Sequence, residues 1–265
     1  MSQHEIIGSS KGFNRIPDLR AQLEKQYEAE LRQKKIDEIR NRNNPQVEPQ
    51  EPQTTQTNLD KDNYIFVPEI NLYIAKQRTH LNKDWNETHQ ALNEQNLRMP
   101  TIPEFISFLN HLRSNKSNEE YQTLFKEITE VRNPWRANWL DAKFSKQGNK
   151  MFIAYNHYLD NQGNLQAKNQ EELTNYLTED RKPGINLTDW LSNHNKFGLP
   201  LPNSKHGDFY YWYPTANHVM TFGAVSDCAL LGCDGGPSFR GSDLGVFACA
   251  EGVALENSQP KGGKQ

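Results

Sequence analysis

The 265-residue chain has little cysteine, few apolar side chains and no long hydrophobic run. Its three cysteines, at positions 228, 233 and 249, are an odd number and do not form the framework of a disulfide-rich secreted protein. No apolar run reaches the roughly 18 residues that span a bilayer. The first residues lack a basic segment followed by an apolar one, so we expect no secretory signal. The sequence therefore predicts a soluble protein that is cytoplasmic or is assembled into a virion or a surface complex.

The chain also lacks an excess of basic residues. Lys and Arg number 30 against 33 Asp and Glu, which gives a net charge of −3 and a pI of about 6.3. We therefore expect no nucleic-acid partner, because such partners are bound through basic surfaces. Only 35 % of the residues are apolar and the mean hydropathy is −0.90, so part of the chain is not expected to contribute to a core.

The N-terminal part accounts for much of this low apolar content. Residues 17–42 predict a charged helix with a narrow apolar stripe, formed by Leu19, Leu23, Tyr27, Leu31, Ile36 and Ile39. The stripe fits a solvated or loosely docked helix, and it also fits a coiled-coil helix that serves attachment or oligomerisation. Residues 43–62 are rich in Pro, Gln, Thr and Asn, which is typical of a flexible linker. We divide the chain into a charged helical segment at 1–42, a linker at 43–62, a domain at 63–258 and a tail at 259–265.

Strand and helix signals alternate in the first half of the domain. Residues 64–75 are rich in β-branched and aromatic types and predict one or two strands, interrupted at Pro68. Two capping-box patterns predict the starts of helices. These patterns consist of Thr101 with Glu104 and of Ser117 with Glu120.

The second half of the domain changes in character. Residues 135–155 predict a loop that runs into a strand, residues 169–177 predict a third helix, and a fourth is expected near Trp190. After residue 198, Gly and Pro become frequent, which favours short strands separated by turns. Helices followed by a Gly-rich half of strands and loops predict an α+β domain.

Common catalytic and cofactor motifs are missing. The chain has no GxGxxG, Walker A, HExxH or CxxC pattern, and no two of its eight histidines are four residues apart, so we expect no cofactor and no preformed metal site. Cys228 and Cys233 are five residues apart and fit a disulfide, a reactive thiol pair or two buried apolar residues. The acidic residues of the last segment fit calcium ligands or turn formers. These are Asp227, Asp234 and Asp243.

A run of spaced residues near the C-terminus carries a resemblance to a known family. The run comprises Trp212, Pro214, Val219, Phe222, Ala224, Ser226, Leu231, Cys233, Pro237, Ser238, Leu244, Gly245 and Val246. Their order and spacing resemble the C-terminal end of the variable proteins of diversity-generating retroelements, which have a C-type-lectin-type fold. A looser similarity extends back through residues 135–144 and 99–112 to Tyr64.

The resemblance implies a binding protein. In such systems a reverse transcriptase copies a template repeat, randomises its adenines and rewrites the variable region of the gene. The expected fold is a C-type-lectin-like α+β domain with short antiparallel strands and flanking helices, and its variable region would cover about residues 208–250. The expected function is non-catalytic recognition of an unidentified protein or glycan, with no metal and no cofactor.

The composition of the last segment is consistent with this mechanism. Template codons of the AAC type keep their final C after adenine randomisation, and codons ending in C never encode Glu, Gln, Lys, Met or Trp. None of these five residue types occurs in residues 223–248. A turn-rich and half-buried segment would also exclude long polar side chains, so the composition supports the resemblance without requiring it.

The resemblance and the period of a strand divide the segment into two sets of residues. The predicted outward, exchangeable set is Tyr211, Tyr213, Gly223, Val225, Asp227, Cys228, Leu230, Gly232, Asp234, Gly235, Gly236, Phe239, Arg240, Gly241, Asp243 and Phe247. The predicted inward anchors are Trp212, Phe222, Ala224, Leu231, Cys233, Pro237, Leu244, Gly245 and Val246. Within the outward set, we expect Phe239, Arg240 and Phe247 to contribute most to binding, because aromatic residues and arginine dominate binding hot spots.

Three alternative functions remain. The wider fold family includes the formylglycine-generating enzymes, so a copper oxidase using Cys228 and Cys233 is one alternative; here Cys233 lies only 11 residues before Leu244, closer than that family places its thiol pair. A calcium-dependent sugar-binding lectin is the second, although the expected carboxylate and amide pattern is absent. A structural attachment protein without variation is the third.

Overall fold

The computed structural model describes residues 59–130, 135–225 and 228–252. The chain divides into two units, residues 1–53 and 54–265, and all described residues belong to the second. The predicted N-terminal helix, most of the predicted linker and the predicted tail lie outside the described residues.

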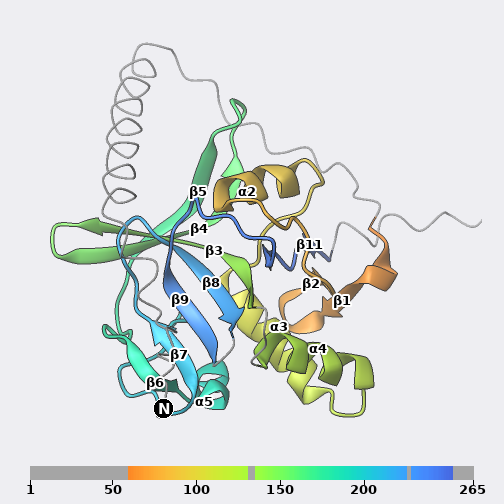
Figure 1. The fold of residues 1–265 in the computed structure, drawn as a ribbon. Helices are drawn as coiled ribbons and strands as arrows, with labels where there is room; N and C mark the ends of the chain where they lie inside the picture. The colour runs from red at the N-terminus through yellow and green to blue at the C-terminus, as the bar shows by residue number, and fades with distance from the viewer. Residues whose placement is uncertain (1–58, 131–134, 226–227, 253–265) are drawn as a thin grey trace, which may run out of the picture. The chain divides into compact units, whose positions relative to one another are not determined.

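The described chain alternates strands and helices (Figure 1). The helical elements are η2 (Lys61–Asn63), η3 (Pro68–Ile70), α2 (Trp85–Asn93), α3 (Ile102–Ser114), α4 (Glu119–Thr129) and α5 (Leu187–Ser192). The strands are β1 (Tyr64–Val67), β2 (Leu72–Ala75), β3 (Arg136–Gln147), β4 (Lys150–Leu159), β5 (Leu165–Glu172), β6 (Arg181–Ile185), β7 (Phe209–Trp212), β8 (Val219–Ala224), β9 (Ala229–Gly235), β10 (Leu244–Gly245) and β11 (Cys249–Glu251). The mixed α+β class is therefore confirmed. None of the described helices has the length and apolar content that crossing a membrane would require.

The strands form two sheets. A large sheet has the order β5-β4-β3-β8-β9-β7-β6, with β10 added parallel to β3, and a small sheet has the order β1-β2-β11. The small sheet joins the two ends of the described chain, because β11 pairs antiparallel with β2 of the β1–β2 hairpin. The prediction of interrupted strands in 64–75 is confirmed, with η3 beginning at Pro68.

Local capping explains where three of the helices begin. Asp84 and Glu87 form a capping box at α2, and Thr101 and Glu104 form one at α3, each with reciprocal side-chain and backbone hydrogen bonds. The second predicted box is wrong in detail, because α4 is capped by Asn118, whose side chain accepts from the Tyr121 amide at 3.1 Å. The predicted helix is present, and its N-cap lies one residue after the predicted Ser117.

Apolar residues from both faces of the large sheet are buried. On one face Phe222 of β8 and Phe209 of β7 contact Trp190 of α5, with ring centroids 6.1 and 5.3 Å apart. Phe105 of α3 contacts Phe222 from the helix side, at 5.2 Å. On the opposite face a smaller cluster joins Trp139 of β3 to the fully buried Trp85 of α2, with Val219, Leu244, Val246 and other residues around them. The sheet is therefore covered by helices on both sides near β3.

Two secondary-structure predictions are wrong, and one helix was missed. Residues 135–155 are almost entirely strand, because β3 begins at Arg136 and β4 at Lys150. Residues 169–177 contain no helix, since β5 extends to Glu172 and pairs with β4 along its whole length. Helix α2 was not predicted at all, because its apolar residues are few. Pairing with a neighbouring strand overrode the local helix signal after residue 169.

Candidate functional site

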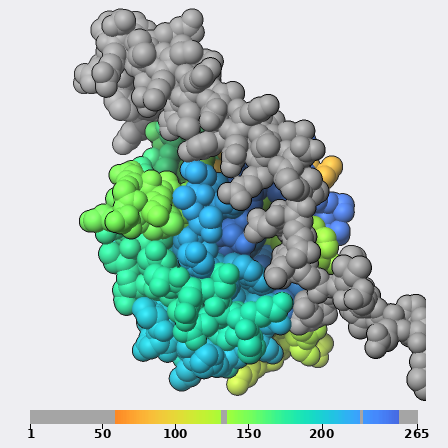
Figure 2. All heavy atoms as spheres, turned by 60° about the vertical axis from the view of Figure 1, so that its left-hand side comes forward, coloured from red at the N-terminus to blue at the C-terminus, as the bar shows by residue number. Residues whose placement is uncertain are grey.

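The C-terminal strands β7, β9 and β8 lie side by side and present one partly open face. Strand pairing places Tyr210 beside Leu230 and Trp212 beside Gly232, and Gly232 beside Thr221. Paired residues share a face, so Tyr210, Trp212, Thr221 and Leu230 form one surface, which we call the outer sheet face. All four side chains are half-buried. Much of the face drawn in Figure 2 comes from the second half of the chain, coloured green to blue.

The outer sheet face has an aromatic character. The rings of Tyr210 and Trp212 lie 5.7 Å apart, and the ammonium of Lys182 lies 5.3 Å from the centre of the Tyr210 ring. Tyr213, directly after β7, is 41 % exposed. Aromatic side chains with a neighbouring cation are typical of surfaces that bind other molecules.

Residues 236–243, which we call the C-terminal loop, connect β9 to β10. Hydrogen bonds to the main-chain carbonyl groups of the loop attach it to the rest of the domain. The Pro237 carbonyl accepts from the Trp85 amide at 3.0 Å, and the Gly241 carbonyl accepts from the Asn82 amide at 3.1 Å. The Asp243 carbonyl accepts from the Ala137 amide at 3.1 Å and from the Arg78 guanidinium at 2.7 Å. The path of the loop is therefore set by carbonyl groups that every residue type has.

Three side chains of the C-terminal loop face solvent. Ser238, Arg240 and Ser242 are exposed, and the side chain of Arg240 is 53 % accessible. Arg240 forms ion pairs with Glu87 and, at 3.4 Å, with Asp84, the two capping residues of α2. Phe239 is half-buried against the ring of Trp135, at 6.2 Å.

Five of the predicted exchangeable residues are buried and not exposed as predicted. These buried residues are Tyr211, Gly223, Cys228, Gly232 and Phe247.

Aromatic contacts and strand register explain two of these errors. Phe247 packs against Phe105 and Phe108 of α3, with centroids 6.3 and 6.1 Å apart. Tyr211 faces the core and its hydroxyl donates to the Leu177 carbonyl at 3.0 Å, so β7 has the reverse of the predicted alternation. Trp212, predicted as an inward anchor, is accordingly half-exposed.

Most of the predicted exchangeable glycines have little room for a side chain. A Cβ at Gly232 would lie 2.9 Å from Thr221 Oγ1, and one at Gly235 would lie 2.9 Å from the Val219 carbonyl oxygen. A Cβ at Gly223 or Gly241 would meet neighbours at 3.1 Å. Gly236 has nothing within 4 Å of the same position. Of these five glycines, Gly236 is thus the one that accepts a substituent freely.

The remaining predicted residues divide by exposure. The predicted exchangeable residues that are at least partly exposed are Tyr213, Val225, Leu230, Asp234, Gly235, Gly236, Phe239, Arg240, Gly241 and Asp243. The predicted anchors that are buried are Phe222, Ala224, Leu231, Cys233, Leu244, Gly245 and Val246, while Pro237 is half-buried. Asp227 lies outside the described residues.

The cysteines are poorly placed for thiol chemistry. All three lie in the described residues, are buried, and form no disulfide. Burial raises the pKa of Cys233 well above its usual value, and its Sγ lies 3.8 Å from the Met220 sulfur. The reactive form of cysteine is the thiolate, so this arrangement does not favour the copper-oxidase alternative.

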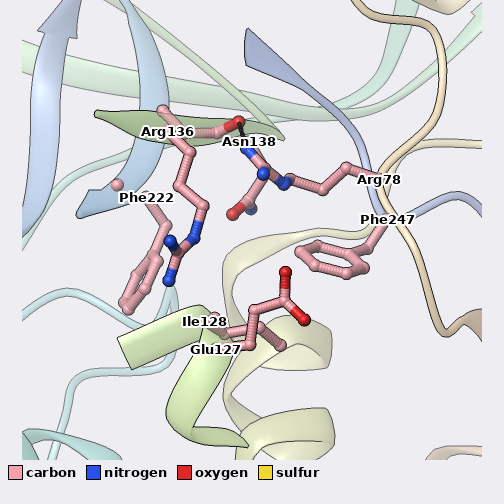
Figure 3. Close-up of a pocket in the computed structure, with 9 residues that line it drawn as sticks. Arg78, Glu127, Ile128, Arg136, Asn138, Phe222 and Phe247 are labelled. Carbon is pink, nitrogen blue, oxygen red and sulfur yellow. Dashed lines mark hydrogen bonds between the residues drawn. The ribbon is translucent and has the colours of Figure 1, made fainter. Parts of the chain in front are cut away.

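Two pockets in the described part of the chain are small. One, of about 10 Å³, lies between β3, β8 and α4; Figure 3 shows Arg136 and Asn138 reaching it from β3 and Glu127 from α4. The Asn138 side-chain nitrogen there is buried without a hydrogen-bond partner. The other, of about 50 Å³, is bordered by Asp141, Tyr155 and other residues. Both are far smaller than the roughly 300 Å³ that a small-molecule site needs.

Sequence reasoning missed a buried group of three ligating side chains: His89 of α2, Asp141 of β3 and His157 of β4. Their ligand atoms all lie within 4.8 Å of one another. His89 Nε2 lies 3.7 Å from Asp141 Oδ1, His157 Nδ1 contacts the same oxygen, and the His157 amide donates to Asp141 Oδ2 at 2.9 Å. No spacing along the chain indicates this group, because its members come from three elements.

The environment of the group favours neutral His89 and ionised Asp141. Burial lowers the pKa of His89 to about 4, against the opposing effect of the Asp141 charge. Burial would raise the pKa of Asp141, but hydrogen bonds from the ring and the main-chain amide of His157 lower it overall.

No family model, no curated protein and no solved structure matches this chain.

Proposed function

We propose that the protein is a non-catalytic binding protein of C-type-lectin-type fold that recognises a protein or glycan through its C-terminal loop and the adjoining outer sheet face. We further propose that the exposed positions of this surface are diversified by a retroelement. The proposal rests on the resemblance of residues 210–252 and on one structural observation, the main-chain attachment of the C-terminal loop.

A diversified surface must separate folding from recognition. The C-terminal loop meets this requirement, because its carbonyl groups bond to Asn82, Trp85 and Ala137 whatever side chains it carries. The residues that follow, Leu244 and Val246, are buried and hold the end of the loop. Side chains such as those of Ser238 and Ser242 point away from these contacts and are exposed. Surface substitutions of this kind change stability by no more than about 0.5 kcal/mol each.

The outer sheet face supplies the constant part of the proposed surface. Tyr210 and Trp212 offer aromatic area next to Lys182. Tyrosine and tryptophan contribute large contact areas at low conformational cost, which is why they are frequent in binding sites. We propose that these residues provide affinity and that the exposed residues of the C-terminal loop provide specificity.

The DNA around the gene tests the diversification. We expect a near-copy of codons 210–250 nearby, in which differences occur at adenines, together with a reverse-transcriptase reading frame. The differences should fall on exposed codons such as those of Ser238 and Ser242, and they should spare codons of buried anchors such as Leu244. A repeat that varies equally at buried and exposed codons, or no repeat at all, would contradict the proposal.

A display library tests the binding function directly. Ser238, Arg240 and Ser242 are randomised in the full chain on the surface of yeast, and a matched control library randomises the buried Phe222, Leu231 and Leu244. We expect most members of the first library to remain protease-resistant and to yield binders for a chosen target protein such as lysozyme. The control library should lose protease resistance. Equal loss in both libraries would show that the loop side chains are needed for folding.

A further inference from the structure

We propose that His89, Asp141 and His157 form a binding site for one divalent transition-metal ion, with Zn²⁺ as its preferred occupant. None of the three residues belongs to the proposed binding surface, and the site does not depend on the proposed function. It rests on the geometry of three buried side chains and on an unpartnered nitrogen among them.

The three side chains are deeply buried and have ligand chemistry. The side-chain exposures are 4 % for His89, 2 % for Asp141 and 5 % for His157. Imidazole nitrogen and carboxylate oxygen are both common ligands of zinc. Ligand atoms about 2.1 Å from a tetrahedral zinc ion lie about 3.4 Å from one another. The 3.7 Å between His89 Nε2 and Asp141 Oδ1 is therefore close to the distance that a shared metal ion requires.

The unpartnered atom is His89 Nε2. It is buried, and no hydrogen bond satisfies it in the structure. A buried polar atom without a partner costs about 1–3 kcal/mol, so native proteins rarely keep one without a reason. A metal ion bound between Nε2 and the Asp141 carboxylate would satisfy this nitrogen and compensate the negative charge of the carboxylate.

Irregular backbone brings the carboxylate and the second histidine together. The pairing of β3 with β8 shifts register between Leu140 and Lys143, which is where Asp141 lies. On the facing strand β4, Asn156 has a positive φ of 56°, directly before His157. The His157 amide then donates to the Asp141 side chain rather than to a strand neighbour. Irregularities of this kind re-aim side chains and are frequent next to functional sites.

Trp85 forms one wall of the site. The Trp85 ring meets the rings of His89 and His157 edge-on, with centroids 4.3 and 4.8 Å away. The Trp85 indole nitrogen donates to the Leu140 carbonyl at 3.1 Å, which fixes this wall. Three protein ligands and one water are a common coordination set for zinc.

Binding would exchange the contact between His157 Nδ1 and Asp141 Oδ1 for two bonds to the metal. Any proton held in that contact would be released, as is usual when a metal displaces a proton from its ligands. The ion would tie α2 to β3 and β4. Because α2 also provides the Trp85 amide that bonds to Pro237, the site would stiffen the support of the C-terminal loop.

Metal content and stability test the site in the full-length chain. The protein is purified without a histidine tag, stripped with a chelating resin, incubated with Zn²⁺, and separated from free metal by gel filtration. We expect about one zinc per chain by mass spectrometry. Zinc should raise the melting temperature, because a ligand that binds only the folded state stabilises it. A wild-type chain that retains no zinc and shows no change in melting temperature would overturn the proposal.

Three variants locate the metal. His89→Gln and Asp141→Asn remove one ligand each with little change of shape, and each should weaken zinc binding by more than the roughly 10–100-fold that outer-shell substitutions cost. His111→Gln is the matched control, since His111 lies 3.4 Å from the Glu69 carboxylate but belongs to no group of three ligating side chains within residues 59–130, 135–225 and 228–252. It should bind zinc like the wild type. Wild-type affinity in both ligand variants would overturn the proposal.

A measurement on the wild-type protein decides the matter if the ligand variants do not fold. In the nitrogen-15 spectrum of the histidine side chains, zinc should shift the signals of two histidines and leave the other six unchanged. Unchanged spectra, or shifts spread over all eight histidines, would overturn the proposal.

Discussion

The separation of folding from recognition in the C-terminal loop leads to a quantitative prediction. The triple variant Ser238→Ala, Arg240→Ala, Ser242→Ala should lose little stability. Each serine is exposed and should contribute within about 0.5 kcal/mol. Arg240 is 53 % accessible, and its ion pairs with Glu87 and Asp84 are surface pairs worth about 0–1 kcal/mol together. The total loss should therefore stay below about 2 kcal/mol.

The matched comparison is Leu244→Ala, directly after the loop. Leu244 is 1 % exposed and packs in the cluster that contains Trp85 and Trp139. Truncation of a buried leucine leaves a cavity and costs about 2–5 kcal/mol. Truncation of the buried Leu244 side chain should thus lower the free energy of unfolding by more than truncation of the three exposed side chains together.

Urea denaturation followed by tryptophan fluorescence measures both variants. With a slope of about 2 kcal/mol/M, the triple variant should move the midpoint by less than about 1 M and Leu244→Ala by about 1–2.5 M, with unchanged slopes. Circular dichroism of the native state checks that each variant keeps its secondary structure. If the triple variant loses as much free energy as Leu244→Ala, the loop depends on its side chains and the reasoning is refuted.

The remaining predictions concern single sites elsewhere in the domain. Gly245→Ala should reduce the free energy of unfolding by more than about 1 kcal/mol, because the new Cβ would lie 2.6 Å from the Thr79 carbonyl oxygen. Gly236→Ala should change the free energy of unfolding by less than about 0.5 kcal/mol, because nothing lies within 4 Å of its Cβ position. The urea midpoints of the two variants test this difference. Burial would raise the pKa of Glu104, but hydrogen bonds from Arg98 at 2.7 and 2.8 Å and the Arg98 charge lower it below its unfolded value. Its stabilising contribution is therefore present above the unfolded pKa and is lost as the pH falls through the folded one, so Glu104→Gln should weaken the acid dependence of the melting temperature; a variant with the same acid dependence as the wild type would contradict this. The three buried thiols should react with a disulfide reagent at pH 8 only after unfolding in guanidinium, and rapid reaction of the native protein would contradict their burial.

Local sequence signals gave the helices with strong caps and the inward residues of β8 and β9. Thr101 and Glu104 interact within one helical turn, so their pattern does not depend on the rest of the fold. Phe222 and Leu231 are buried as predicted, because alternation along a strand separates its two faces. The capping box of Asp84 and Glu87 was equally visible, but α2 was overlooked because its apolar residues are few.

The faces of the last strands could not be obtained in the same way. Alternation states which residues share a face, but not which face is covered, and Tyr211 and Trp212 are both large aromatic residues. Parallel pairing of β7 with β9 set Tyr211 beside the buried Leu231 and so directed it to the core. Phe247 was misplaced because α3 covers it, and α3 lies far away in the sequence.

By itself, the sequence determined the α+β class, three helix positions (α3, α4 and α5 at Trp190) and the division of the C-terminal segment into spaced apolar anchors and small or polar residues. It did so because capping and alternation act over a few residues. Only the tertiary structure decided which surface is open and that His89, Asp141 and His157 meet. Those outcomes depend on strand order, on a register shift in β3 and on the docking of α2, and contacts between residues far apart in the chain leave no periodic signal in the sequence.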